Sequence, residues 1–127
     1  MVRERALQIV LILVGLLFAA AIIPSVGGLV DPAHSDTGDT MQMAIYFALG
    51  IFLLMAVRNP SAHRSLIAFA AWSSLAHAAV MSTLGFEMPS ERVGFLEGSA
   101  VLVVIGVMFI VLAPRKPSQP IVATRTA

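Results

Sequence analysis

The chain has 127 residues, of which 58% are hydrophobic and 12% are charged, and its mean hydropathy is +0.91. Soluble domains carry about 25% charged residues, and a domain this small buries too little of its surface to hide so much apolar material. With a formal net charge of only +1, the composition excludes a disordered chain, a basic nucleic-acid-binding protein and an ordinary cytosolic enzyme. It indicates a membrane protein that sits in a lipid bilayer.

The first two apolar stretches cover residues 6–23 and 41–57. The first has Gln8 as its only strongly polar residue and ends where Pro24 and a glycine pair break the pattern. The second stops at Arg58-Asn59-Pro60, because the residue before a proline disfavours a helix. Each stretch is close to the length that a helix needs to cross a hydrocarbon core of about 30 Å.

The last two stretches cover residues 65–84 and 93–113. The third is the most polar of the four, and the fourth ends at the Pro114-Arg115-Lys116-Pro117 segment. Residues 114–127 are rich in Pro, Ser and Thr, which predicts a disordered tail.

Helices are the expected structure of all four stretches. None of them alternates like a barrel strand, and each is about twice as long as a barrel strand needs. Helices are the only other way to satisfy the backbone inside lipid. We therefore expect an all-α protein, a four-helix transmembrane bundle formed by residues 1–113 as one domain.

The start of the chain allows a second interpretation. Arg3, Arg5, an apolar run and Ala19-Ala20-Ala21 resemble a signal peptide with its cleavage site. The apolar run continues to Ile23, which is longer than in a usual signal peptide and favours a retained helix.

Basic residues predict the orientation. With four helices, seven of the eight basic residues fall on one side of the membrane, and only Arg92 falls on the other. The seven are Arg3, Arg5, Arg58, Arg64, Arg115, Lys116 and Arg125. The positive-inside rule then places both termini in the cytoplasm and makes the chain a multi-pass membrane protein.

His77 is the most notable polar residue within the apolar stretches. It lies seven positions before Leu84, roughly 10 Å below the outer end of the third helix. Ser73 and Ser74 lie one turn earlier on the same face. An ionisable residue at this depth needs a partner, so His77 either lines a small polar pocket or forms a hydrogen bond that holds the helices together.

Glu97 is the expected partner of His77. It lies four residues inside the fourth helix, and a short loop makes the third and fourth helices antiparallel neighbours. If the two pair, replacing either should destabilise the protein, and replacing both should recover part of the loss. If the helix instead begins at Gly98, Glu97 is an interfacial acid near a helix N-terminus.

Gln42 and Tyr46 are one turn apart near the outer end of the second helix. Together with His77 and Glu97 they are candidates to line one polar pocket in the outer leaflet. Alternatively they anchor the helix at the membrane interface, where Tyr is common.

Small residues recur at helical spacing on the third and fourth helices. Such stripes allow close helix packing, within one chain or between chains. The packing candidates are Ala70 and Ala78 on the third helix and Gly94, Gly98 and Gly106 on the fourth.

Motifs for chemistry are missing from the sequence. It contains no cysteine, P-loop, nucleophile elbow, dinucleotide-binding glycine pattern or HExxH. We expect no metal and no cofactor, and we interpret the acidic segment Asp31–Asp39 as a solvated outer loop. The missing motifs argue against an enzyme.

A resemblance to a known family is carried by the block from Arg58 to Phe69, by Ala71-Trp72-Ser73-Ser74 and His77-Ala78 after it, and by Arg5-Ala6-Leu7 before it. The chain resembles an uncharacterised family of small bacterial four-helix membrane proteins, a domain of unknown function. The resemblance implies a four-helix integral membrane protein and assigns no catalytic residue. The layout is also similar to that of DoxX-like proteins at the level of fold alone.

Three functions follow as hypotheses, of which the third is a membrane oxidoreductase component that borrows a quinone or haem from a partner. The first is a non-enzymatic membrane module or accessory subunit that acts through helix association, as a homo-oligomer or with a membrane-protein partner. The alternative is a binder or transporter of a small lipophilic molecule or proton through the pocket around His77. A cavity at His77 would favour the alternative, and a site filled by side chains would favour the first.

Overall fold

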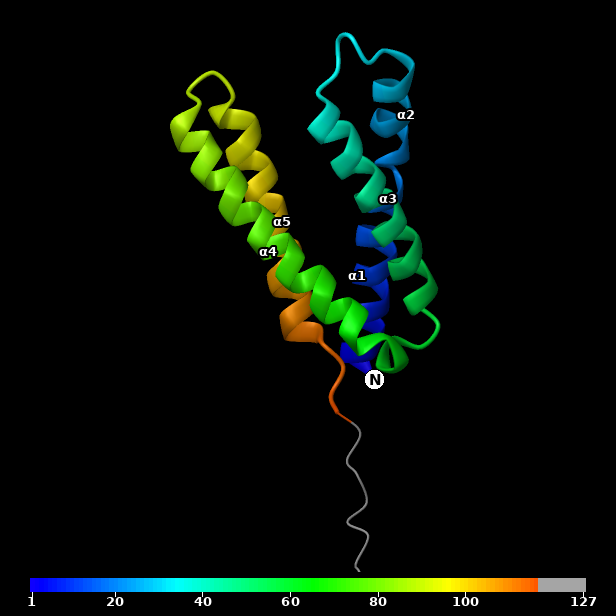
Figure 1. Ribbon diagram of the computed structural model, residues 1–127. Helices are drawn as coiled ribbons and strands as arrows, with labels where there is room; N and C mark the ends of the chain where they lie inside the picture. Colours follow the sequence, from blue (N-terminus) through cyan, green and yellow to red (C-terminus); the bar gives the residue numbers. More distant parts are fainter. Residues whose placement is uncertain (117–127) are drawn as a thin grey trace, which may run out of the picture.

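The computed structural model describes residues 1–116 of the chain (Figure 1). The protein is all-α, as predicted, and four helical segments are long and apolar enough to cross a membrane. They are Val2–Val30, Thr37–Ala56, Pro60–Glu87 and Arg92–Leu112. Most of the predicted tail at 114–127 lies outside the described residues.

The first span continues past the break that the sequence indicated. Helix α1 covers Val2–Ala19 and helix α2 covers Ile22–Val30, with a turn at Ala20 and Ala21 between them. Pro24 therefore lies in the first turn of α2, where its missing N–H is not needed. A proline ring clashes with the carbonyl of the residue four positions earlier in a continuous helix, which here is Ala20. The helix is therefore interrupted before Pro24 and not after it.

Helix α3, Thr37–Ala56, begins four residues before its predicted start at 41. Asp36 is its N-cap residue, and its carboxylate accepts a hydrogen bond of 3.0 Å from the backbone nitrogen of Asp39. This cap satisfies one of the free N–H groups of the first turn, which lets a polar segment start the helix.

The second half of the chain forms a helical hairpin. A short 3-10 helix, η1, covers Pro60–His63 and leads directly into helix α4, Arg64–Glu87. After a tight loop, helix α5 covers Arg92–Leu112. Arg92 donates a hydrogen bond of 3.1 Å to the carbonyl of Gly85 and so ties the loop together.

The four spans form two hairpins that diverge (Figure 1). Helices α1 and α2 pack on α3, and α4 packs on α5, whereas contacts between the two pairs are fewer. The pairs meet at the end that holds the N-terminus and η1, which we call the base, and separate toward the α2–α3 and α4–α5 loops, which we call the open end.

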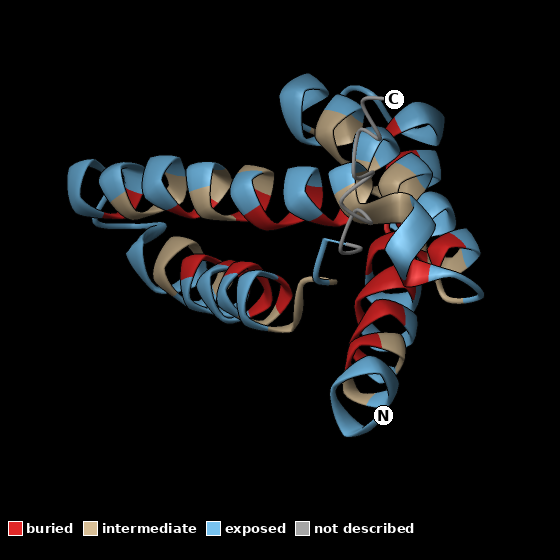
Figure 2. Cartoon of the chain, turned by 90° about the horizontal axis from the view of Figure 1, so that it is seen from below, coloured by how far each residue is buried: buried red, intermediate tan, exposed pale blue. Residues whose placement is uncertain are grey.

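The largest buried side chains lie near the base. Leu11, Leu53, Ile67 and Phe109, one from each span, are fully buried. Figure 2 shows buried residues on the facing sides of the helices and exposed residues around the outside. Many of the exposed residues are large and apolar, which is expected of helices that face lipid.

Hydrogen bonds also join elements at the base. Arg3 donates bonds of 2.9 Å to the carbonyls of Val111 and Ala113, which links the start of α1 to the end of α5. Arg64 donates a bond of 3.0 Å to the carbonyl of Pro114. These donors satisfy carbonyls at and just after the C-terminal end of α5, where the helix itself provides no partner.

Candidate functional site

His77 lies near the middle of α4, ten residues or roughly 15 Å before the helix ends at Glu87. It is half-buried and faces the other hairpin. The edge of one ring meets Tyr46 of α3, with the ring centroids 5.6 Å apart, and Tyr46 in turn lies 4.8 Å from Phe18 of α1. Three aromatic rings from three helices thus line up where the hairpins begin to separate.

These rings border a cavity of about 300 Å³, which we call the aromatic cavity. Every lining residue comes from α1, the turn after it, α3, α4 or α5. They are Leu17, Phe18, Ala21, Met43, Tyr46, His77, Met81, Gly98, Val101, Leu102 and Ile105. Tyr46 and His77 are the only two among them whose side chains carry nitrogen or oxygen.

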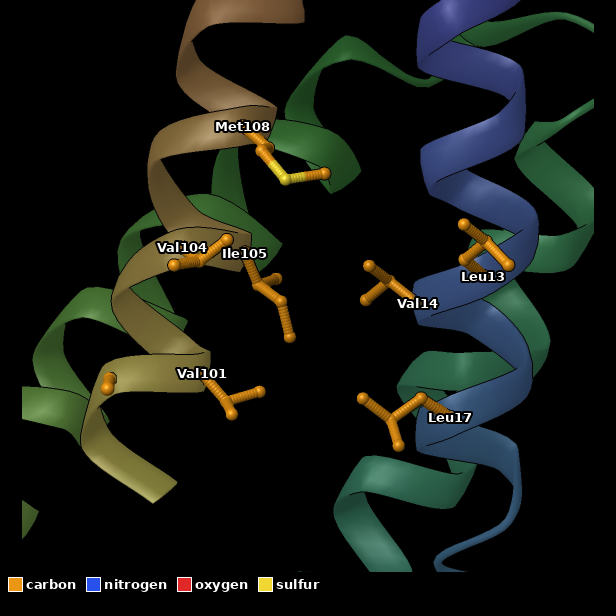
Figure 3. A pocket seen from close by; sticks show the side chains of 8 residues that line it. Leu13, Val14, Leu17, Val101, Val104, Ile105 and Met108 are labelled. Carbon is orange, nitrogen blue, oxygen red and sulfur yellow. The ribbon is translucent and has the colours of Figure 1, made fainter. Parts of the chain in front are cut away.

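A second space of about 410 Å³ adjoins the aromatic cavity on the side of α1 and α5. Figure 3 shows side chains of both helices pointing toward each other across this apolar cleft. Its lining is aliphatic apart from one methionine: Leu13, Val14, Leu17, Ala100, Val101, Val104, Ile105 and Met108. Because Leu17, Val101 and Ile105 line both spaces, the cleft continues from the aromatic cavity between α1 and α5.

A third space of about 440 Å³ adjoins the aromatic cavity toward the open end, and we call it the polar mouth. It shares Met43, His77 and Met81 with the aromatic cavity. Two acidic residues, Asp39 and Glu91, also line it. The remaining lining residues are Gly38, Gln42, Val80, Leu84, Gly94 and Phe95. His77 therefore stands between an apolar interior and a polar entrance.

Three of the predicted pocket residues come together and three do not. Gln42 and His77 both line the polar mouth, and Tyr46 and His77 both line the aromatic cavity. Ser73 instead donates a hydrogen bond of 3.3 Å to the carbonyl of Ala70 in its own helix. The hydroxyl of Ser74 is buried with no hydrogen-bond partner among the described residues.

Glu97 is exposed and lines neither space at His77. The register of the α4–α5 hairpin explains this. Ser99 is hydrogen-bonded to Ser82 at 2.6 Å, which places Glu97 level with residues near Thr83. That level is about six positions, or roughly 9 Å, from His77 along the helix.

The small residues predicted for packing also divide into two groups. Ala70 and Ala78 are buried, and a side chain at Gly106 would meet Leu75 at 2.7 Å. A side chain at Gly98 would meet the end of Met81 at 2.6 Å. Gly94 differs, since nothing lies within 4 Å of the position that its Cβ would take.

Sequence reasoning missed the walls of the site that α1 and α5 provide. Phe18, Leu17 and Val101 belong to helices that are apolar on every side, so no pattern distinguishes a cavity wall from a lipid-facing surface. Asp39 carried a usable signal, because it lies three positions before Gln42 and hence on the same helical face.

Comparison with known proteins gives one finding. No curated protein and no solved structure matches the chain significantly. A family model matches residues 2–120, which is nearly the whole chain. The protein, a multi-pass membrane protein by the length and composition of its helices, therefore belongs to DUF6632, a family of unknown function.

Proposed function

We propose that the protein binds a small lipophilic molecule in the aromatic cavity, with His77 in contact with the polar part of that molecule. The observation that carries the proposal is a cavity at His77 that adjoins both an apolar cleft between α1 and α5 and a polar mouth. An aliphatic cleft within a bilayer is a poor site for water, because water there would find few polar partners. A lipophilic molecule fits it better.

The position of His77 supports the same function. An imidazole at membrane depth needs a hydrogen-bonding partner, and His77 makes no hydrogen bond to any residue of the described part of the chain; its one aromatic contact is with Tyr46. A bound molecule with an oxygen atom would supply the partner that residues 1–116 do not.

Association with a partner or a second copy is the weaker candidate. The glycines that allow close helix approach, Gly50 and Gly106, face α1 and α4 of the same chain. Gly94 is free for such a contact, but one glycine without a stripe is a weak packing signal.

The orientation belongs to the proposal too. We place the base in the cytoplasm, because basic residues gather at that end of the spans: Arg3, Arg5, Arg58, Arg64, Arg115 and Lys116. We place the protein in the cell inner membrane because its sequence resembles small bacterial membrane proteins. The polar mouth then opens toward the outer leaflet.

Photo-crosslinking tests the binding function. The full chain in nanodiscs of phosphatidylcholine is irradiated with a diazirine-bearing long-chain alcohol, and the labelled peptides are identified by mass spectrometry. We expect labelling around Tyr46 and His77 that saturates and that an excess of unlabelled alcohol removes. Labelling spread evenly over lipid-facing residues, with no saturable component, would contradict the proposal.

A pair of matched variants sharpens the test. Val101, 50% exposed, lines the cavity and the cleft, whereas Val103, 41% exposed, lies on the same helix and lines neither. Val101→Trp should fill the cleft and abolish the saturable labelling, and Val103→Trp should leave it unchanged. Equal labelling of both variants would show that the probe binds elsewhere.

A further inference from the structure

The aromatic cavity selects against a charged head group. None of its lining side chains is a carboxylate, a guanidinium or an ammonium. A charge brought into such a space would lose its hydration without gaining a counter-charge, which is strongly unfavourable. A molecule that reaches the inner side of His77 is therefore expected to be uncharged there.

The walls favour a flat ring over a flexible polar head. Phe18, Tyr46 and His77 present three aromatic rings, and the two neighbouring pairs are tilted and edge-on. Aromatic rings gain specific attraction from a further ring at such angles. A sugar or glycerol head would carry more hydroxyls than the two polar side chains can satisfy.

The hydrogen-bonding capacity of the cavity indicates which oxygens the ring carries. Neutral imidazole has one donor and one acceptor nitrogen, and a phenol both donates and accepts. His77 has no hydrogen-bond partner among the described residues. His77 can thus donate to a ring carbonyl or accept from a ring hydroxyl, which are the two forms of one quinone oxygen.

The apolar cleft provides for a tail. From Ala100 to Met108 its wall on α5 spans eight positions, roughly 12 Å of helix. Opposite it, α1 contributes Leu13, Val14 and Leu17 (Figure 3). A hydrocarbon chain attached to a ring in the aromatic cavity can lie along this cleft and leave it into the bilayer.

We infer that the ligand is an uncharged lipid with a conjugated ring, a ring oxygen near His77 and a long apolar tail, which is the chemistry of a membrane quinone. This inference rests on the proposed binding function and narrows it to one ligand class. The polar mouth suggests the contrasting class, a cationic amphiphile held by Asp39 and Glu91, and the experiment separates the two.

The test compares three probes with ten-carbon tails on the full chain in detergent. They are decylubiquinone, decyltrimethylammonium and 1-decanol, and the readout is the shift of the unfolding temperature with probe concentration. A ligand that binds only the folded protein raises this temperature saturably. We expect a saturable rise with decylubiquinone and weaker effects with the other two probes.

Variants connect the effect to the site. His77→Phe keeps a ring against Tyr46 but removes the hydrogen bond, so the Kd for decylubiquinone should rise about tenfold. His77→Gln, which restores a donor and an acceptor, should recover part of the affinity. His34→Phe, in an exposed loop pair with Asp31, is the matched control and should bind as the parent does.

Several outcomes would overturn the ligand class. They are a preference for decyltrimethylammonium, an equal response to 1-decanol, or unchanged affinity in His77→Phe. If saturable crosslinking at His77 persists in those cases, the binding function stands and only the quinone class falls. If His77→Phe folds poorly, Val101→Trp decides, because a quinone in the cleft must be displaced by that indole. Unchanged quinone binding in Val101→Trp would reject the site.

Discussion

Gly50 lies within helix α3 and Gly94 lies in the first turn of helix α5, and their surroundings differ completely. A side chain at Gly50 would meet the backbone nitrogen of Ala19 and, at 2.7 Å, the carbonyl oxygen of Gly15. Around Gly94 there is open space. The sequence pattern indicated Gly94, because Gly98 follows it at helical spacing, and did not indicate Gly50, whose partner lies on α1. Whether a glycine is a packing residue depends on what lies opposite it.

This contrast yields a prediction. Gly50→Ala should lower the free energy of unfolding by about 1–3 kcal/mol, because backbone atoms cannot move aside as a flexible side chain can. Gly94→Ala should be neutral or stabilise by up to about 1 kcal/mol, since alanine is the better helix former. Thermal unfolding in detergent measures both, and equal losses in the two variants would contradict the described α1–α3 contact.

His77 and Glu97 provide the second prediction at this scale. The α4–α5 register separates them, and Glu97 is exposed. Glu97→Leu should therefore leave the unfolding temperature unchanged or raise it, because a carboxyl group that faces lipid is unfavourable.

In a double-mutant cycle of His77→Leu and Glu97→Leu, the stability changes should add to within about 0.5 kcal/mol. A larger coupling energy, with partial recovery in the double variant, would favour the ion pair that the sequence suggested and would place Glu97 back in the site.

At the level of elements, the α4–α5 hairpin is held by a small polar contact in an apolar setting. The hydroxyl of Ser99 is buried, donates to the carbonyl of Ala78 at 2.9 Å and is paired with Ser82 at 2.6 Å. Ser73 makes its bond only within its own helix. Two serines within apolar helices, Ser73 and Ser99, thus differ in their effect on helix association, and the sequence alone does not distinguish them.

Ser99→Ala should lower the free energy of unfolding by about 0.6 kcal/mol for each interhelical bond lost. Ser73→Ala, the matched control, should change it by less, because no bond between helices is removed. A greater loss in the control would mean that the helix register differs from the one described.

The helix bounds also show what local sequence predicts. The existence of each helix follows from its apolar composition, and the start of α3 follows from a cap at Asp36 that the apolar pattern did not include. The expected end of the first helix at residue 23 depended on Pro24. The structure instead has Pro24 in the first turn of α2, where a proline is tolerated.

At the scale of the whole molecule, the hairpins meet at the base and separate at the open end, and the candidate site lies in the gap between them. Fully buried residues from all four spans and the bonds of Arg3 hold the base together. The site is therefore built from residues distant in sequence, on helices whose positions depend on packing at the other end.

Topology is the prediction that belongs to this scale. Reporter fusions at residues 1, 61 and 127 should report a cytoplasmic location, and fusions near Asp36 and Ser90 should report an external one. The reason is that six of the seven basic residues in the described part of the chain lie at the base, and only Arg92 lies at the open end. A cytoplasmic signal at Asp36 would reverse the orientation and place the polar mouth in the inner leaflet.

The sequence by itself determined the all-α class, the number of membrane-spanning segments and three members of the candidate site, Gln42, Tyr46 and His77. These properties are local: a span is recognised by its own hydropathy, and a polar residue within it is conspicuous. The tertiary structure decided which helix faces meet, and with them the exclusion of Glu97 and the walls formed by Phe18 and Val101. A helix that is apolar on all sides has no pattern that selects its inner face. The close approach at Gly50 and Gly106 and the bonds of Ser99 select it only once the helices are together.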